Sequence, residues 1–314
     1  MLPHSRRSFE TREIHLNLQD RDRNCRFAGR QPGLNTAYIH TRSSRLMTLR
    51  ASLRYATFTL SRTGLRRPLI WIRHLGLDST DVMIASFPRS GSTWFRFLMA
   101  HILTGKTFGF DDINYACPQV GLQKIGLPTL PGGGRLIKTH EPYRNEYRKA
   151  IYVARDPRDV AISLYLRGSS LGAFGDISFD DFLPLFLGGE MTNVGSWQKH
   201  VTIWLDSPLA SADRLLVVRF EDLRTKPDAS LARALEFLGI TVNPGKIDAS
   251  IAANSLAKMR QKEDSSRALA KNRIENGRFV RQGSVAGWRN ELSAEHVKLF
   301  DLHARPELER LRYS

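Results

Sequence analysis

The sequence contains only two cysteines among its 314 residues, Cys25 and Cys117. Because Cys25 lies in a segment that we expect to be poorly packed, no structural disulfide is expected, and a reducing compartment is the default. Long apolar stretches are also missing, since none approaches the roughly 18 residues that a membrane-spanning helix requires. We therefore expect a cytoplasmic protein without a membrane span.

Acidic residues are absent from residues 24–77. Residues 1–80 hold 15 Arg and no Lys against five acidic residues, a net charge of +10 out of +16 for the whole chain. A nucleic-acid-binding domain carries its basic face on the folded part of the chain. Because most of the excess charge lies at one end, we expect no nucleic-acid partner, and the mildly basic remainder suits a small polyanionic ligand.

Residues 1–78 are predicted to be a basic, poorly ordered N-terminal extension. The first 46 residues are polar and Arg-rich and show no periodicity, which is typical of disorder. Residues from about 47 to 60 have the pattern of a basic amphipathic helix. A solvated extension, an organelle-targeting segment and a membrane-surface helix stay open as its role, and so does Met47 as the true start of the chain.

From residue 79 onward, short apolar segments alternate with helical patterns. Strands are predicted at 81–87, 135–137, 150–154 and 215–220, and helices over 95–103, from 157, over 197–205, from 227 and from 294. Buried strands that alternate with helices predict a central parallel sheet covered by helices on both faces. We therefore expect a single α/β domain over residues 79–314, with ligands bound at the carboxyl ends of the strands.

The first predicted strand runs directly into a loop of small residues and then into a helix. Such a junction presents backbone N–H groups and a helix N-terminus to anionic oxygens. Gly91 lets the backbone approach an anion closely, Ser90, Ser92 and Thr93 offer hydroxyl donors, and Arg89 adds a guanidinium. Taken alone, the loop is equally compatible with an ordinary strand-to-helix turn.

The other strand ends carry residues suited to the same site. Lys138 and His140 follow the second strand, Arg155 follows the third, and Phe220 ends the fourth. Each of these side chains also has a plain structural interpretation, such as a solvated Lys or a surface ion pair. Because the carboxyl ends of parallel strands meet at one edge of a sheet, we expect all of them to converge on one site.

Together, these segments resemble the motifs of the cytosolic-type sulfotransferases. The similar segments are the loop Phe87–Trp94, Lys138-Thr139-His140, Arg155–Ser163, Phe220-Glu221-Asp222-Leu223, Arg281-Gln282-Gly283 and Gly287–Asn290. In that family they are the 5′-phosphosulfate loop, the Lys-Thr-His segment, the 3′-phosphate segment, the Tyr-Glu-Asp-Met segment and the two parts of the C-terminal box. The resemblance keeps the family order from about residue 80 to the C-terminus.

The resemblance implies a P-loop NTPase-like fold and transfer of a sulfuryl group from 3′-phosphoadenosine 5′-phosphosulfate (PAPS) to a hydroxyl or amine of a small-molecule acceptor. It implies His140 as the base for in-line transfer and Lys138 and Arg89 as catalytic cations. The residues implied to bind PAPS are Arg89, Ser90, Gly91, Ser92, Thr93, Trp94, Arg155, Ser163, Phe220, Leu256, Arg281, Gln282 and Gly283. The acceptor pocket is expected from residues 108–134, 168–193 and 258–278.

Several family positions hold other residues here. Arg89 replaces the usual loop Lys, Phe220 replaces a Tyr, and Gln282 replaces a Lys of the last box. Asn254 and Leu256 stand where the family has the Thr and Phe that hold adenine. These changes bear on nucleotide contacts more than on the reaction.

The family's dimer segment is also altered, because Lys298 replaces its terminal Glu. The reversed charge counts against the family-type homodimer and leaves a monomer or another dimer open.

Two other functions compete with a sulfotransferase. A P-loop kinase or NTPase needs Gly-x4-Gly-Lys-[Ser/Thr], but no Lys follows Gly91, and the later strands end in Lys138 and Arg155 rather than in an acid. A non-catalytic nucleotide-binding module would bind PAPS without turnover. The sequence shows no Cys/His spacing suited to zinc and no acidic strand end suited to Mg²⁺, so no metal is expected.

Overall fold

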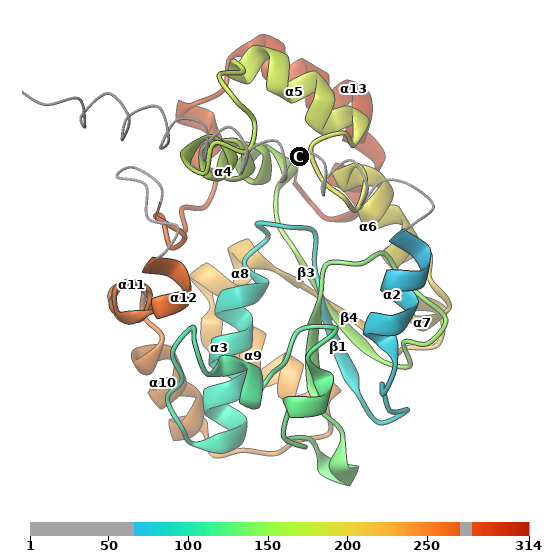
Figure 1. The fold of residues 1–314 in the computed structure, drawn as a ribbon, viewed down its shortest axis with the longest axis vertical. Helices are drawn as coiled ribbons and strands as arrows, with labels where there is room; N and C mark the ends of the chain where they lie inside the picture. The colour runs from blue at the N-terminus through green and yellow to red at the C-terminus, as the bar shows by residue number, and fades with distance from the viewer. Residues whose placement is uncertain (1–65, 271–277, 314) are drawn as a thin grey trace, which may run out of the picture. The chain divides into compact units, whose positions relative to one another are not determined.

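Four parallel strands form the centre of the fold (Figure 1). The computed structural model describes residues 66–270 and 278–313. The strands are β1 (Val82–Ala85), β2 (Leu136–Thr139), β3 (Ala150–Ala154) and β4 (Leu215–Arg219), in the spatial order β2-β1-β3-β4. Every strand pair among them is parallel, so the predicted α/β fold with a central parallel sheet is confirmed.

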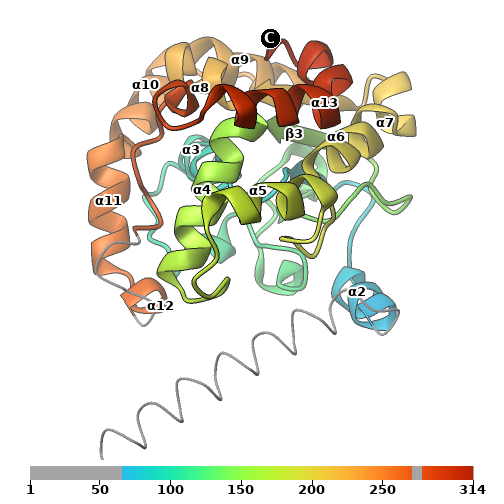
Figure 2. The ribbon, with the colours of Figure 1, turned by 90° about the horizontal axis from the view of Figure 1, so that it is seen from above.

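Helices cover both faces of the sheet because successive strand residues point to opposite sides. Met83 and Ala85 of β1 pack into one apolar cluster, and Val82 and Ile84 pack into the other. The first cluster is covered by α4 (Pro157–Ser170), α5 (Phe179–Gly188), α6 (Trp197–Leu205) and α13 (Ala294–Arg310), which lie together in Figure 2. The second is covered by α3 (Ser92–Thr104), α9 (Pro227–Phe237) and α10 (Pro244–Ala253).

Shorter elements connect these layers. These are the helices α7 (Pro208–Ser211), α8 (Phe220–Thr225) and α12 (Arg267–Ala270), together with the longer α11 (Leu256–Ser265). The 3₁₀ turns are η1 (Ile113–Tyr115), η2 (Gln123–Ile125), η3 (Pro131–Gly133) and η4 (Gly287–Asn290). In the part of the chain that the structure describes, no helix has both the length and the apolarity needed to cross a bilayer.

Local capping explains why several predicted helices have the bounds they have. The Asp156 carboxylate accepts a hydrogen bond from the backbone N–H of Arg158, and Pro157 occupies the first helical position of α4. Ser293 caps α13 in the same way, with its hydroxyl accepting from the backbone N–H of His296. The predicted helix over 197–205 is confirmed with the same bounds in α6.

Several predicted boundaries near the site need correction. Strand β1 ends at Ala85 rather than at residue 87, and Phe220 begins α8 instead of ending β4. Strand β2 was expected to end at residue 137 but continues to Thr139, because Lys138 pairs with Ile84 of β1 and also bridges Gln119. Lys138 is therefore a strand residue rather than a loop residue. Helix α3 begins at Ser92, three residues before the predicted start, so the end of the small-residue loop is already helical.

Helix α2 (Arg66–His74) lies inside the segment that the sequence assigned to a poorly ordered extension. It is tied to the domain by His74, which is buried and whose Nε2 lies 2.7 Å from the Tyr147 hydroxyl. The Gln123 side chain donates to the backbone carbonyls of Arg73 and Leu75, at 2.7 and 2.8 Å. Residues 66–78 are thus part of the folded unit, and the predicted amphipathic helix over 47–60 lies outside the described residues.

Candidate active site

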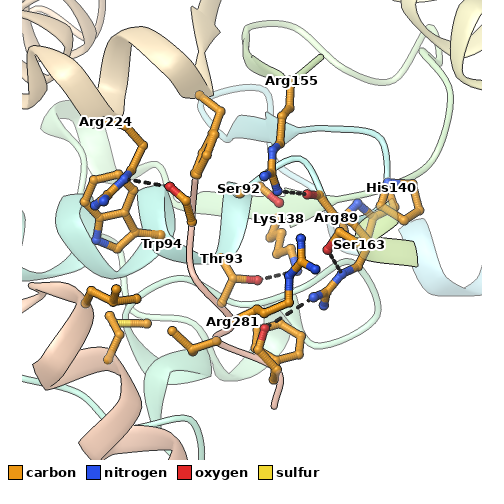
Figure 3. Close-up of a pocket in the computed structure, with 18 residues that line it drawn as sticks. Arg89, Ser92, Thr93, Trp94, Lys138, His140, Arg155, Ser163, Arg224 and Arg281 are labelled. Carbon is orange, nitrogen blue, oxygen red and sulfur yellow. Dashed lines mark hydrogen bonds between the residues drawn. The ribbon is translucent and has the colours of Figure 1, made fainter. Parts of the chain in front are cut away.

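A cavity of about 220 Å³ lies beyond the carboxyl ends of the four strands (Figure 3). Segments far apart in the sequence line it, including the loop after β1, the end of β2, Arg155 after β3 and Phe220 after β4. The predicted residues that line it are Arg89, Gly91, Ser92, Thr93, Trp94, Lys138, His140, Arg155, Ser163, Phe220, Leu256, Arg281 and Gly283. The expected convergence at one sheet edge is therefore found.

The charge of this lining has one sign. Five of its side chains are cationic, those of Arg89, Lys138, Arg155, Arg224 and Arg281, and none of the lining residues is Asp or Glu. Five positive charges in one cavity repel one another, which is unfavourable in free energy unless an anion occupies the cavity. The cavity is therefore suited to a ligand with several negative charges.

The loop after β1 brings backbone N–H groups to the floor of this cavity. Gly91 has a φ of 89° and lies directly before the first residue of α3, so the loop turns sharply into a helix N-terminus. The Ser86 hydroxyl donates to the Ser92 hydroxyl at 2.7 Å and fixes its position. The first turn of α3 holds no acidic residue, so nothing on the helix competes with an anion for these amides.

Lys138 projects from β2 into the cavity, and its Nζ donates to the Thr93 hydroxyl at 3.3 Å. The side chain is buried. Loss of hydration, followed by the nearby positive charge of Arg96, lowers the pKa of Lys138 to about 7. The Lys138 side chain can therefore change between the ammonium and the neutral amine near neutral pH, depending on the charge of the molecule that fills the cavity.

His140 holds a neutral imidazole whose protonation can be inferred from its partners. Its Nδ1 lies 2.8 Å from the Ser86 carbonyl oxygen, which can only accept, so Nδ1 carries the proton and Nε2 has a free lone pair. Burial, followed by the positive charge of Lys138, lowers the pKa of His140 to about 3. The ring thus has the protonation state that a general base needs.

A second histidine holds the backbone of His140 in place. The His200 Nε2 donates to the His140 carbonyl at 3.1 Å, so its Nδ1 accepts from the Tyr152 hydroxyl at 2.9 Å. His200 is fully buried, and burial lowers its pKa to about 4. It is a neutral structural link between β3 and the end of β2, which sequence reasoning did not identify.

Arg155 lines the cavity and is held there by a set of weak contacts. Its Nη atoms donate to the carbonyls of Arg89 and Ser284 at 3.3 and 3.2 Å, and one lies 3.8 Å from the Asp159 carboxylate. Its buried Nε has no hydrogen-bond partner among the described residues. Burial lowers the pKa of Arg155. These long contacts and the unpartnered Nε leave donor capacity for an anion.

Arg89 joins the loop to Ser163. Its Nε donates to the Ser163 hydroxyl at 3.1 Å, and an Nη donates to the Phe279 carbonyl at 3.2 Å (Figure 3). Its backbone has a φ of 71°, unusual for a residue other than glycine. Burial, followed by the charge of Arg167, lowers its pKa to about 10. The guanidinium points toward the predicted 3′-phosphate residues, not only toward the loop to which it belongs.

An apolar end of the cavity is formed around Trp94. The indole N–H donates to the Asn254 carbonyl at 2.8 Å, and the ring lies edge-on to Phe220 with centroids 6.3 Å apart. Leu256 and Met259 of α11 line the same cavity. An aromatic and aliphatic wall beside a cationic one suits a ligand with a flat ring at one end and anionic groups at the other.

Comparison with known proteins identifies the family. A family model described as the sulfotransferase domain matches residues 79–312. The chain belongs to the sulfotransferase family. Sulfotransferase 1A1 of Rattus norvegicus is 27% identical over 246 residues, covering 71% of this chain and 82% of the relative. Sulfotransferase 2A2 of Mus musculus is 28% identical over 236 residues, covering 70% of this chain and 81% of the relative.

Solved sulfotransferase structures share the fold. Retinol dehydratase in complex with androsterone and the inactive cofactor PAP matches with a TM-score of 0.63 and 21% identity, covering 76% of this chain and 83% of the other. Mouse sulfotransferase SULT7A1 complexed with PAP matches with a TM-score of 0.59 and 20% identity, covering 76% and 86%. The competing prediction of a P-loop kinase or NTPase is not favoured by these findings.

Within this sulfotransferase domain, two predicted ligand residues do not line the cavity. Gln282 is exposed, because the chain turns at Gly283, where φ is 58°, and only its neighbours Arg281 and Gly283 face inward. Ser90 is buried beneath the loop, and its hydroxyl has no partner among the described residues. The roles predicted for Gln282 and Ser90 in binding PAPS therefore stay predictions that the lining of the cavity does not support.

Sequence reasoning also missed residues of the sulfotransferase cavity. They are Pro88, Arg224, Met259, Phe279 and Val280. Arg224 lies one helical turn after Phe220 in α8, donates to the Gly283 carbonyl at 3.0 Å and stands 5.3 Å from the centroid of the Trp94 ring. Arg224 could have been predicted from its spacing, because residues four positions apart lie on the same face of a helix.

Proposed function

We propose that this chain transfers the sulfuryl group of PAPS to a hydroxyl or amine of a small-molecule acceptor, with His140 as the base. The observation that carries the proposal is a single cavity that combines a helix N-terminus, five cations without a lining carboxylate, and a neutral imidazole. Two structures of this fold are complexed with PAP, the nucleotide that remains when PAPS loses its sulfuryl group.

The residues of the cavity suit the three parts of PAPS. The amides of Gly91–Thr93 at the start of α3 would hold the 5′-phosphosulfate. Arg155, Ser163 and Arg281 would hold the 3′-phosphate, and the unpartnered Nε of Arg155 supports this assignment. The Trp94 ring and the apolar side chain of Leu256 would flank the adenine, as their place at the apolar end supports.

The reaction requires one proton transfer and one exchange of bonds at sulfur. PAPS supplies an activated sulfuryl group when it is bound. The His140 Nε2 takes the proton of the acceptor hydroxyl while the acceptor oxygen forms its bond to sulfur, and the bond between sulfur and the 5′-phosphate oxygen breaks. The Lys138 ammonium meets the negative charge that develops on that leaving oxygen. The products are the sulfated acceptor, PAP and a proton on His140.

Transfer of labelled sulfate tests this proposal. We expect the protein to move ³⁵S from labelled PAPS to members of a panel of phenols, alcohols and amines, and to do so in the presence of EDTA. Binding of PAPS without transfer to any acceptor would instead support a non-catalytic nucleotide-binding module. Phosphoryl transfer from ATP that is lost in EDTA would support a kinase.

Binding of PAP should take up a proton through Lys138. The pKa of Lys138 is lowered to about 7 in the empty cavity, so at pH 8 most molecules carry a neutral amine there. A bound phosphate raises this pKa and restores the ammonium. Calorimetry at pH 8 in buffers of different ionisation enthalpy should show uptake close to one proton per PAP. The Lys138→Met variant should show almost none, and equal uptake by both proteins would contradict the role of Lys138.

Replacing Gly91 by alanine should weaken PAP binding. A Cβ at this position would lie 2.3 Å from Cδ2 of Phe220, and the φ of +89° disfavours any L side chain. Either the loop or Phe220 must move, so we expect the Kd of PAP to rise at least about tenfold, measured by calorimetry. Gly105→Ala is the matched control, because Gly105 has a φ of +68° at the other end of α3 and no atom near its Cβ position. If the Gly91→Ala variant bound PAP as tightly as the wild type, the conformation of this loop would not be required for binding.

A further inference from the structure

We propose that the acceptor is a small polyol, about the size of one ring, and that Arg73 of α2 helps to select it. This inference rests on the proposed sulfuryl transfer and adds the class of acceptor. It comes from a second cavity that adjoins the first at the reacting groups.

The second cavity has a volume of about 150 Å³ and shares Pro88, Lys138 and His140 with the first. Because both cavities meet at the His140 ring, a molecule in the second cavity can present a hydroxyl to this base while the nucleotide occupies the first. The other lining residues are Arg73, Gln119, Val120, Thr139, Glu141, Asn193 and Val194. The cavity is therefore placed where an acceptor must bind.

The size of this cavity limits the acceptor. A buried cavity of about 150 Å³ in another protein takes up benzene, so the space here suits a single ring or a short chain. The androsterone of the retinol dehydratase complex has a larger skeleton of fused rings. A steroid would extend far beyond the walls that the described residues form around His140.

The lining chemistry selects for hydroxyl groups. Arg73 offers guanidinium donors, Glu141 offers carboxylate acceptors, and Gln119 and Asn193 offer carboxamides that both donate and accept. A polyol can pair with donors and acceptors together, because each hydroxyl does both. A flat apolar phenol offers a single hydroxyl to this mostly polar lining, and this mismatch costs affinity.

Arg73 is held at the rim of the cavity by contacts on both sides. One of its Nη atoms donates to the Val120 carbonyl at 2.9 Å, and the other lies 3.9 Å from the Glu141 carboxylate. Its side chain is 45% exposed, so it keeps donors that can reach a ligand. Helix α2 precedes residue 79 and thus lies outside the segment that matches the sulfotransferase family.

The test compares acceptors and one variant. With saturating PAPS, kcat/KM is measured for glycerol, myo-inositol and methyl glucoside, and for phenol, 2-naphthol and androsterone. We expect the polyols to have the higher kcat/KM, and Arg73→Met to lower it about 10- to 100-fold for polyols without lowering it for phenol. The Kd of PAP should not change, because Arg73 does not line the nucleotide cavity.

Two further variants keep the test decisive. Arg310→Met is the matched control, since Arg310 is similarly exposed (41%) and pairs with Asp206 on the surface, outside both cavities. Gln119→Leu tests the rim independently if Arg73→Met does not fold, and it should also lower kcat/KM for polyols. Preference for 2-naphthol or androsterone, with no effect of either rim variant, would overturn the inference while leaving sulfuryl transfer intact. Failure to transfer to any acceptor would instead refute the proposed function.

Discussion

Replacing His140 by alanine should lower kcat by about 10²–10⁴ and leave the Kd of PAP nearly unchanged. The loss is expected because the Nε2 lone pair is the only part of the ring that we assign to the reaction, whereas Nδ1 is engaged with the Ser86 carbonyl. Single-turnover transfer of ³⁵S from PAPS measures the chemical step, and calorimetry measures PAP binding.

His303→Ala is a suitable control, because His303 is exposed on α13 and lines neither cavity. It should retain full turnover. A His140 variant that also retains near wild-type turnover would exclude the imidazole as the base. Loss of PAP binding in parallel with turnover would instead indicate that His140 mainly supports the shape of the cavity.

Replacing Arg155 by alanine should weaken PAP by on the order of 100-fold, but AMP, which lacks the 3′-phosphate, by less than about threefold. The difference is expected because the buried guanidinium forms charge-assisted hydrogen bonds with the 3′-phosphate. Its removal therefore costs binding free energy for PAP but not for AMP, which has no 3′-phosphate. Competition with a fluorescent nucleotide gives both dissociation constants in one experiment. Equal losses for PAP and AMP would contradict the assignment of Arg155 to the 3′-phosphate.

The Arg155→Ala substitution should also lower the stability of the fold, and this effect must be separated from its effect on binding. Asp159 is buried 3.8 Å from the guanidinium, so removing the cation leaves a buried carboxylate with less compensation, which destabilises by about 3–5 kcal/mol when such a pair is broken. Ser163→Ala removes no charge and serves as the second variant. It should reduce PAP affinity by a smaller factor, again with little effect on AMP.

The sequence predicted the sheet and most of the nucleotide cavity because these depend on short-range patterns. Each apolar run of β1 to β4 is short and leads directly into the residues that line the cavity. Because the carboxyl ends of parallel strands meet at one edge of the sheet, Lys138 and Arg155 could be assigned to the same site without coordinates. The small and hydroxyl residues of the loop before α3 predicted its part of the cavity.

What the sequence did not predict depends on contacts between distant residues. The bond between His74 and Tyr147 spans 73 residues, and no local pattern in either segment indicates it. It places α2, and therefore Arg73, beside the reacting groups. Met259 could have been found as the residue three positions after Leu256 on one helix face, but the segment around it is polar and was not predicted to be helical.

The position of Gln282 outside the cavity could not be predicted for a different reason. The order of motifs matched the sulfotransferase family, but a match of order does not determine which of three consecutive loop residues faces the ligand. In the structure the loop turns so that Arg281 and Gly283 line the cavity and Gln282 is exposed. Orientation in a loop depends on backbone torsions that a single sequence does not determine.

A crystal structure of the protein with PAP is the sharpest test of the proposed site. The proposed function predicts the 5′-phosphate on the amides of Gly91–Thr93, the 3′-phosphate within hydrogen-bond distance of Arg155 and Ser163, and the His140 Nε2 facing the 5′ end. PAP bound in the cavity with its 3′-phosphate away from Arg155, or with the His140 ring turned from the 5′-phosphate, would contradict it.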